Sequence, residues 1–363
     1  MRLGRRSAGG YPRTAAPCVR QPRGRGRPVS HFGARGRRRP FQEVHPEPLP
    51  DIRRLSVLAA RYHRYGGPEV LSVEEADEPH AGPGQVRISV RATGVTPADW
   101  YLRSGMLKEM ASLRFPHIPG MDAAGVVDEV GEGVTGTAVG DAVFGLVPLA
   151  RLGGAAARYA VLEAWAHKPR AWSFETAGGA AGNVETATRV LDALGAAEGM
   201  TLLIEGAAGG AGTMTAQLAR ARGLTVIGTA SERNHDFLDG LGVTPVTYGP
   251  GLADRVAPLA PRGVDVVLDA AGKGSLPDLV AIAKDPHRVV TIADFDAARH
   301  GVRLTRSGVG EPGWSGLPHA ASLADEGRLT VPVHRVFPLR DIAAAHEESA
   351  TGHARGKIVV TVP

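Results

Sequence analysis

Residues 201–231 read TLLIEGAAGGAGTMTAQLARARGLTVIGTAS and have the order of a strand, a tight turn, a helix and a second strand. Residues 202–204 are a short apolar run bounded by polar residues and glycines, which is typical of a buried parallel strand. The glycine cluster at 206–212 predicts the turn, and apolar residues recur at helical spacing across 213–222. A second apolar run follows at 224–227. This order predicts an α/β domain with a doubly wound parallel sheet.

The glycines of this turn suit the binding of a pyrophosphate. A phosphate at a helix N-terminus is attracted by free N–H groups and by the helix dipole, and a Cβ atom would obstruct its approach. The spacing is GxxGxxG, because an alanine occupies the first glycine position of the commoner GxGxxG pattern. The alternative is a glycine-rich turn that binds no nucleotide. We predict a dinucleotide-binding turn formed by Gly206, Ala207, Gly209, Gly210, Ala211 and Gly212.

Length and composition indicate a globular protein of two domains, with 363 residues and 43% hydrophobic residues. The net charge is +5, but residues 1–40 hold 12 of the 42 basic residues and none of the 37 acidic ones. The other 30 basic residues face all 37 acidic residues, so the rest of the chain carries −7. That balance does not favour nucleic-acid binding by the folded part. The single cysteine, Cys18, excludes internal disulfides and cysteine metal clusters.

Residues 1–54 are rich in Arg, Gly and Pro and have few apolar residues with which to form a core, so we expect a disordered leader. Three explanations compete: a nucleic-acid-binding arm, an Arg-rich targeting segment, or a start codon placed too far upstream. We favour the last. The leader lacks the apolar stretch of a secretory signal, and no apolar run in the chain is long enough for a membrane span.

The pattern of residues 55–180 is that of a β-rich domain with short strands separated by Gly and Pro. A strand, a turn at 66–68 and a second strand come first. Across 85–95, apolar residues then alternate with Arg87, Ser89 and Arg91, which predicts a half-buried strand. Beyond residue 182 the pattern changes to alternating helices and strands.

Four motifs together resemble the medium-chain dehydrogenase/reductase superfamily. They are TPADWYLRSG at 96–105, GMDAAGVVDEVGEGVTGTAVGDAVFG at 120–145, GAAGGAG at 206–212 and ARGKIVV at 354–360. More narrowly, the chain resembles the zinc-independent quinone oxidoreductases related to zeta-crystallin.

The resemblance implies a domain order and an assembly. Residues 55–180 would form a GroES-like catalytic domain, 181–306 a Rossmann NADP-binding domain, and 307–363 a segment that completes the catalytic domain. The active site would lie in the cleft between the domains. The resemblance also implies a homodimer, and we expect a cytoplasmic protein.

Two positions bear on metal binding. In zinc-dependent members of the superfamily a cysteine ligand stands at the position of Thr96 and a histidine ligand at that of Met121, and the four-cysteine structural loop is missing here. Neither a threonine hydroxyl nor a methionine thioether is an ordinary zinc ligand. We therefore expect no metal, and hydride delivery to an electrophilic acceptor rather than alcohol oxidation.

The resemblance also points to three site residues. Tyr101 matches the family's active-site tyrosine, whose phenol could hydrogen-bond a carbonyl oxygen that gains charge. Its alternative role is packing beside Trp100. Thr96 stands where family members usually have asparagine, so a polar group remains near the nicotinamide without its amide. Thr186 matches a position that contacts the nicotinamide in relatives, and helix capping is its alternative role.

The end of the second Rossmann strand predicts the choice of cofactor. An acidic residue there would bind the ribose hydroxyls of NAD, but this chain has Ala230 and Ser231 at that place. Glu232 is close by, and Arg233 follows it. A small polar pocket with an arginine suits the 2′-phosphate of NADP(H). Tyr248 matches a family tyrosine near that phosphate. The alternative is that Ser231 and Arg233 are ordinary loop residues.

These features predict an NADPH-dependent reductase whose substrate is a small-molecule quinone or α,β-unsaturated carbonyl. An enoyl-thioester or alkenal double-bond reductase is the alternative among enzymes. A non-catalytic NADPH-binding protein, or an RNA-binding role for the Arg-rich arm, is the alternative outside them.

Overall fold

A computed structural model describes residues 56–308 and 310–363. These all belong to a compact unit, Arg53–Pro363. The predicted disordered leader, 1–54, lies outside the described residues. Within the described ranges no helix combines the length and apolarity needed to cross a membrane.

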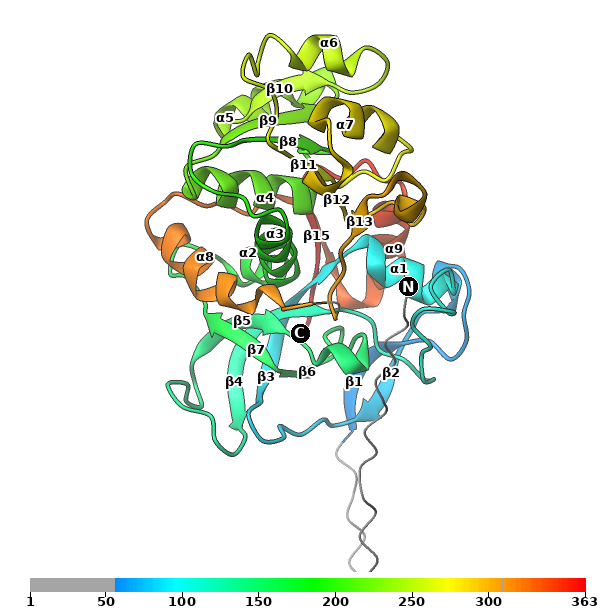
Figure 1. Ribbon diagram of the computed structural model, residues 1–363. Coiled ribbons are helices and arrows are strands. Elements are labelled where there is room, and N and C mark those ends of the chain that lie inside the picture. The colour runs from blue at the N-terminus through cyan, green and yellow to red at the C-terminus, as the bar shows by residue number, and fades with distance from the viewer. Residues whose placement is uncertain (1–55, 309) are drawn as a thin grey trace, which may run out of the picture. The chain divides into compact units, whose positions relative to one another are not determined.

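The doubly wound sheet predicted from residues 201–231 has six parallel strands (Figure 1). Their order, β10-β9-β8-β11-β12-β13, reverses direction between β8 and β11, and ligands of such sheets bind outside the carboxyl ends of the strands at this reversal. The strands are β8 (Thr201–Glu205), β9 (Thr225–Ala230), β10 (Thr244–Thr247), β11 (Val266–Asp269), β12 (Val289–Thr291) and β13 (Arg303–Leu304).

Helices cover both faces of this sheet. Successive side chains of a strand point to opposite faces, so a strand that is apolar throughout has an apolar side chain to bury on each face. On β8, Leu202 and Ile204 join one apolar core and Leu203 joins another, and all three are fully buried. The first core contains α3 (Ala181–Ala193), α4 (Gly210–Ala221), α5 (His235–Gly240) and α8 (Gly316–Asp325), and the second contains α6 (Leu252–Val256) and α7 (Leu276–Ala283).

The β-rich domain is built on a seven-stranded sheet in the order β14-β15-β3-β4-β5-β7, with β6 paired to β3. The C-terminal strand β15 lies between β14 and β3, so the end of the chain completes this sheet. A separate antiparallel pair consists of β1 (Ser56–Arg61) and β2 (Ser72–Asp77). The sheet strands are β3 (Val86–Val95), β4 (Asp122–Val130), β5 (Ala142–Leu146), β6 (Tyr159–Leu162), β7 (Ala164–His167), β14 (Val333–Pro338) and β15 (Lys357–Thr361); the helices of this part are α1 (Pro97–Ser104), α2 (Phe174–Gly178) and α9 (Ile342–Ala350).

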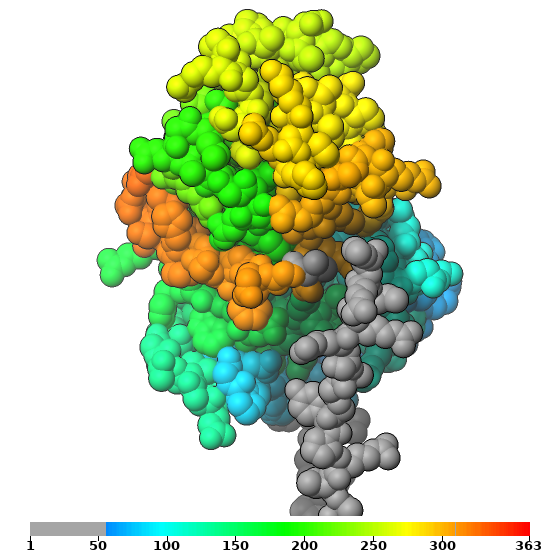
Figure 2. Space-filling view, viewed as in Figure 1, coloured from blue at the N-terminus to red at the C-terminus, as the bar shows by residue number. Residues whose placement is uncertain are grey.

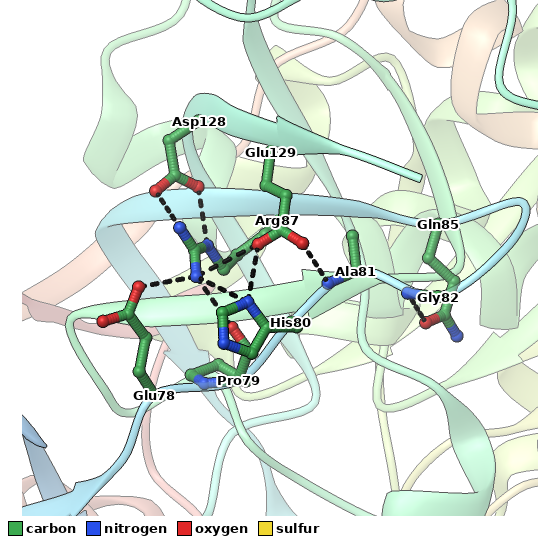
Figure 3. Close-up of polar contacts among 9 residues, drawn as sticks. All are labelled: Glu78, Pro79, His80, Ala81, Gly82, Gln85, Arg87, Asp128 and Glu129. Atoms are coloured by element: carbon green, nitrogen blue, oxygen red, sulfur yellow. Dashed lines mark hydrogen bonds and ion pairs between the residues drawn. The ribbon is translucent and has the colours of Figure 1, made fainter. Parts of the chain in front are cut away.

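The prediction that β3 is half-buried is wrong at Arg87, which is only 9% exposed. Its guanidinium donates hydrogen bonds to Glu78 at 2.6 Å and to both carboxylate oxygens of Asp128 at 3.1 and 2.9 Å (Figure 3). The segment after β2 folds over the strand and brings Glu78 to it. A buried arginine is tolerated here because carboxylates neutralise it. Arg91, on the same strand, is exposed.

Hydrogen bonds from two backbone N–H groups join the parallel-sheet domain to the β-rich part. The N–H of Gly356 donates to the carbonyl of Ala208 at 3.3 Å, and the N–H of Gly182 donates to Asp122 Oδ2 at 3.0 Å. In Figure 2 the segment that contains α8 (orange) lies between the green residues of the parallel-sheet domain and the teal residues of the β-rich part. The limits of the domains at 180 and 306 stay a prediction.

Candidate active site

The glycine-rich turn follows β8 directly, and the six predicted residues lie together in it. Gly206 has a φ of +79°, and Gly209 is the N-cap of α4. A Cβ built on Gly212 would lie 2.3 Å from the carbonyl oxygen of Gly206, so the turn has room only for glycine there. Ala207 is fully buried beneath the turn.

The start of α4 fits a pyrophosphate. The first N–H groups of a helix have no intrahelical acceptor, and here they belong to Gly210, Ala211 and Gly212. A Cβ on Gly209 would meet only the carbonyl oxygen of Gly206, at 3.4 Å, so the side of the turn away from the protein is open. Backbone N–H groups at a helix N-terminus, the helix dipole and glycines that carry no side chain are what a dinucleotide phosphate requires.

The three residues predicted to select the cofactor lie at the carboxyl ends of two neighbouring strands. Thr247 of β10 pairs with Ala230 of β9, so Ser231 and Tyr248 each follow a paired residue. Arg233 is exposed, and Tyr248 is 55% exposed. No acidic residue takes the place of Ser231, which is the N-cap of the short helix η3 (Glu232–Asn234).

Thr96 is the N-cap of α1, and its hydroxyl proton is already engaged. Both its N–H and its Oγ1–H donate to Asp99 Oδ2, at 2.7 and 2.8 Å. The other oxygen of Asp99 accepts the N–H of Gly120 at 3.0 Å. Toward a ligand, Thr96 can therefore act only as a hydrogen-bond acceptor.

Tyr101, on α1, is half-buried and packs between two aromatic rings. Its ring centroid lies 4.1 Å from that of Trp100 and 6.1 Å from that of Phe295. Phe295 follows β12, so Tyr101 reaches the carboxyl edge of the parallel sheet. Across residues 56–308 and 310–363 its phenol oxygen makes no hydrogen bond, so the predicted packing beside Trp100 leaves that oxygen free.

Thr186 lies inside α3, which makes the capping alternative wrong. Its hydroxyl donates to Glu185 Oε2 at 3.3 Å and accepts from Arg189 at 3.4 Å. Glu185 and Arg189 are 2% and 6% exposed and form an ion pair at 2.7 Å. Arg189 also donates to Thr305, and Ser307 donates to Glu185, so the pair anchors the segment after β13 to α3.

Sequence reasoning missed this ion pair. The i,i+4 spacing of an acidic and a basic residue in a helix was its only signal, and that spacing is common on exposed faces.

A second pair that sequence reasoning missed is Asp122 with Lys357, at 3.9 Å and almost fully buried. Burial raises the pKa of Asp122, and the neighbouring ammonium group opposes that rise. Lys357 also lies beneath the glycine turn, because a Cβ on Gly210 would come within 3.2 Å of its Cδ. The pair therefore links β4 to the start of α4.

Met121 precedes β4, and its carbonyl accepts the N–H of Val147 at 3.0 Å. In the described part of the chain, no three His, Cys, Asp or Glu side chains are grouped so that they could hold a metal ion. A cavity of about 70 Å³ lies in the β-rich domain, and none of the predicted site residues lines it.

Comparison with known proteins defines the class first. Residues 82–171 match the alcohol dehydrogenase GroES-like domain, and residues 241–360 match the zinc-binding dehydrogenase family. Together with the glycine turn and the two sheets, these matches define an oxidoreductase of the medium-chain dehydrogenase/reductase superfamily. This class suggests a nicotinamide cofactor, and the glycine turn fits one.

Similar proteins identify the family within this superfamily. Quinone oxidoreductase of Rattus norvegicus is 30% identical over 322 residues, covering 83% of this chain and 95% of that protein. The structure of the quinone oxidoreductase from Coxiella burnetii has a TM-score of 0.73 and 28% identity, covering 85% of this chain and all of that one. The chain belongs to the quinone oxidoreductase family of this superfamily.

Other relatives are longer proteins. Synaptic vesicle membrane protein VAT-1 homolog of Rattus norvegicus is 36% identical over 234 residues, covering 62% of this chain, and the match spans only 57% of that protein. Spectinabilin polyketide synthase system protein NorB of Streptomyces orinoci is 35% identical over 309 residues, which is 80% of this chain and 14% of that protein.

Proposed function

We propose that the protein transfers hydride from NADPH to quinones or α,β-unsaturated carbonyls without zinc. The observation that carries this proposal is the position of Tyr101. Tyr101 lies at the carboxyl edge of a parallel sheet whose glycine turn fits a pyrophosphate, and its phenol oxygen has no hydrogen-bond partner among the described residues.

In this mechanism the bound cofactor supplies the hydride, and the chain supplies position and charge stabilisation. The N–H groups at the start of α4 would hold the pyrophosphate, and Thr186 and Thr96 would contact the nicotinamide. Tyr101 donates a hydrogen bond to the acceptor oxygen as it becomes negative, and solvent delivers the final proton. Thr96 cannot take over this donation, because Asp99 holds its proton.

We further propose that Ser231, Arg233 and Tyr248 bind the 2′-phosphate. Two features support this phosphate site: position 231 holds a serine instead of an acidic residue, and the guanidinium of Arg233 is exposed. The Arg233→Ala variant should erode the preference for NADPH over NADH, since a charge-assisted phosphate contact contributes about 1.5–3 kcal/mol. An undiminished preference in that variant would place the contact elsewhere.

The absence of zinc ligands is part of the same proposal. The hydroxyl group of Thr96 donates its proton to Asp99, and the side chain of Met121 offers only a thioether. Elemental analysis of the purified protein should find no stoichiometric zinc, and a chelator should not reduce activity. One zinc per chain, with activity lost to the chelator, contradicts it.

The deciding experiment follows NADPH oxidation with quinones, enones, enoyl thioesters and, in reverse, ethanol with NADP⁺. We expect turnover with the quinones or enones and little oxidation of ethanol. Vigorous ethanol oxidation would contradict the reaction class, and tight NADPH binding with no acceptor turned over would favour a non-catalytic binding protein.

A second candidate is enoyl-thioester reduction, which the similarity to the structure of CurK enoyl reductase favours, with a TM-score of 0.73 and 25% identity. The hydride step is the same, but the acceptor is a thioester. A kcat/KM for an enoyl thioester well above that of every quinone would select it. That the protein is a cytoplasmic homodimer stays a prediction, and light scattering tests its oligomeric part.

A further inference from the structure

Arg355, in the C-terminal segment, reaches a helix of the other domain. Its guanidinium carbon lies 5.1 Å from the centroid of the Phe237 ring, a cation–π contact. Phe237 belongs to α5, whereas Arg355 lies two residues before β15 of the β-rich sheet. The side chain of Arg355 is exposed, and no carboxylate among residues 56–308 and 310–363 forms an ion pair with it.

The backbone beside Arg355 is fixed against the glycine turn. The next residue, Gly356, donates its N–H to Ala208 and forms a bridge with Gly209. Gly356 has a φ of +85°, and a Cβ there would lie 2.2 Å from the carbonyl oxygen of Pro332. Arg355 therefore starts from a defined point beside the N-terminus of α4.

The guanidinium end of the Arg355 side chain also has a defined position. Phe237 lies four residues after Arg233, on the helix that follows the loop at the end of β9. The arginine thus starts beside the pyrophosphate turn and ends against the helix that begins at the 2′-phosphate loop. A cation–π contact orients the guanidinium without neutralising it, and its N–H groups stay available to a phosphate.

We propose that Arg355 binds the 2′-phosphate of NADPH together with Arg233, so that a residue of the C-terminal segment helps to select the cofactor. This inference rests on the proposed NADPH dependence. It makes the C-terminal segment part of the nucleotide site, in addition to its role in the sheet.

Isothermal titration of the full chain tests this inference without turnover. The ligands are NADPH, NADH, 2′,5′-ADP and 5′-AMP, and the variant is Arg355→Gln. Arg335→Gln is a matched control, because Arg335 is also an exposed arginine of this segment, with its guanidinium carbon 4.7 Å from the ring of Phe337. Thermal melting checks that both variants are folded.

We expect Arg355→Gln to weaken NADPH and 2′,5′-ADP by about tenfold or more, with NADH, 5′-AMP and the control unchanged. An equal loss for NADH would place the contact on the pyrophosphate and overturn the inference, as would unchanged NADPH affinity. A parent protein that prefers NADH, or binds neither dinucleotide, overturns the proposed cofactor and this inference with it. If the parent prefers NADPH and Arg355→Gln does not alter that preference, only this inference fails.

Discussion

The ring of Tyr101 meets the ring of Phe295 edge to face, with centroids 6.1 Å apart and an interplanar angle of 78°. One ring comes from α1 of the β-rich domain and the other from the loop after β12 of the parallel sheet. Such a pair contributes about 0.5–1.5 kcal/mol beyond its buried area. It fixes the distance between Tyr101, the proposed hydrogen-bond donor, and the edge where the nicotinamide is expected.

Replacing Phe295 with alanine should therefore disturb acceptor binding more than cofactor binding. Tyr101 loses the ring that orients it, so the KM for the acceptor should rise several-fold while the Kd for NADPH stays within about twofold. Steady-state kinetics and fluorescence titration measure the two. Leu259→Ala, at another exposed apolar residue of the parallel-sheet domain, is the control. Equal effects of the two variants would argue against a role for Phe295.

The Tyr101→Phe variant separates donation from packing, because phenylalanine keeps both ring contacts. Enone reduction gathers charge on one oxygen, whereas a quinone needs less help, so kcat should fall more for the enone, by about tenfold or more. Parallel kinetics on both acceptors give the ratio. Unchanged enone turnover would leave Tyr101 with packing alone.

Gly212→Ala should prevent the turn from forming. The new Cβ would lie 2.3 Å from a backbone carbonyl, so the start of α4 must shift, and we expect loss of NADPH binding and a Tm lower by several degrees. Gly240→Ala is the matched control, since Gly240 ends α5 and its Cβ would meet nothing within 4 Å. That variant should be neutral or slightly stabilised, and calorimetry compares them.

Glu205 should make stability depend on pH. It is 5% exposed at the end of β8, and its pKa is raised by burial and further by the carboxyls of Asp269 and Asp278. The native state thus holds a proton that the unfolded chain releases, so its stabilising effect is full below the ordinary pKa of 4.5 and is lost as pH rises through the raised value.

Relative to the parent, Glu205→Gln should therefore gain stability as pH rises from 4 to 8, and each unit of raised pKa corresponds to about 1.4 kcal/mol. Urea denaturation at several pH values measures this. Glu132→Gln, at an exposed carboxyl, should run parallel to the parent, and parallel behaviour of Glu205→Gln would contradict the assignment.

His346 should make stability depend on pH in the direction opposite to that of Glu205. Burial lowers its pKa to about 3, and the charge of Arg103, whose Nε donates to His346 Nδ1 at 3.4 Å, adds to the effect. The neutral ring stabilises the native state above pH 6.5, and this contribution is lost as pH falls toward 3. His346→Gln can still accept from Arg103 and should flatten the decline of Tm across that window.

Sequence reasoning identified the features that local patterns encode. The turn at 206–212, the helix after it and the strands around it depend on glycine placement and apolar periodicity within about 30 residues, and they fold as expected. The resemblance brought Tyr101 and Thr186 to notice, but it could not reveal that Asp99 takes the hydroxyl proton of Thr96.

The features that sequence missed depend on segments distant in the chain. Asp122 meets Lys357 only because β15 enters the sheet beside β3, and Arg87 is buried only because the segment after β2 folds over it. A charged residue in an alternating strand pattern indicates an exposed position until its partners are known. Tertiary packing overrode the local pattern at Arg87.

The place of β15 beside β3 has a consequence during protein synthesis. The parallel sheet is continuous in sequence, so it can form while the ribosome is still adding residues. On the edge of β3 that faces β15, β6 pairs with residues 86–89, but residues 92–95 have no partner until residues 357–361 emerge, roughly 260 residues and about 10–50 s later. The β-rich domain is therefore the last to become complete, and until then a nascent chain exposes an open strand edge to its neighbours.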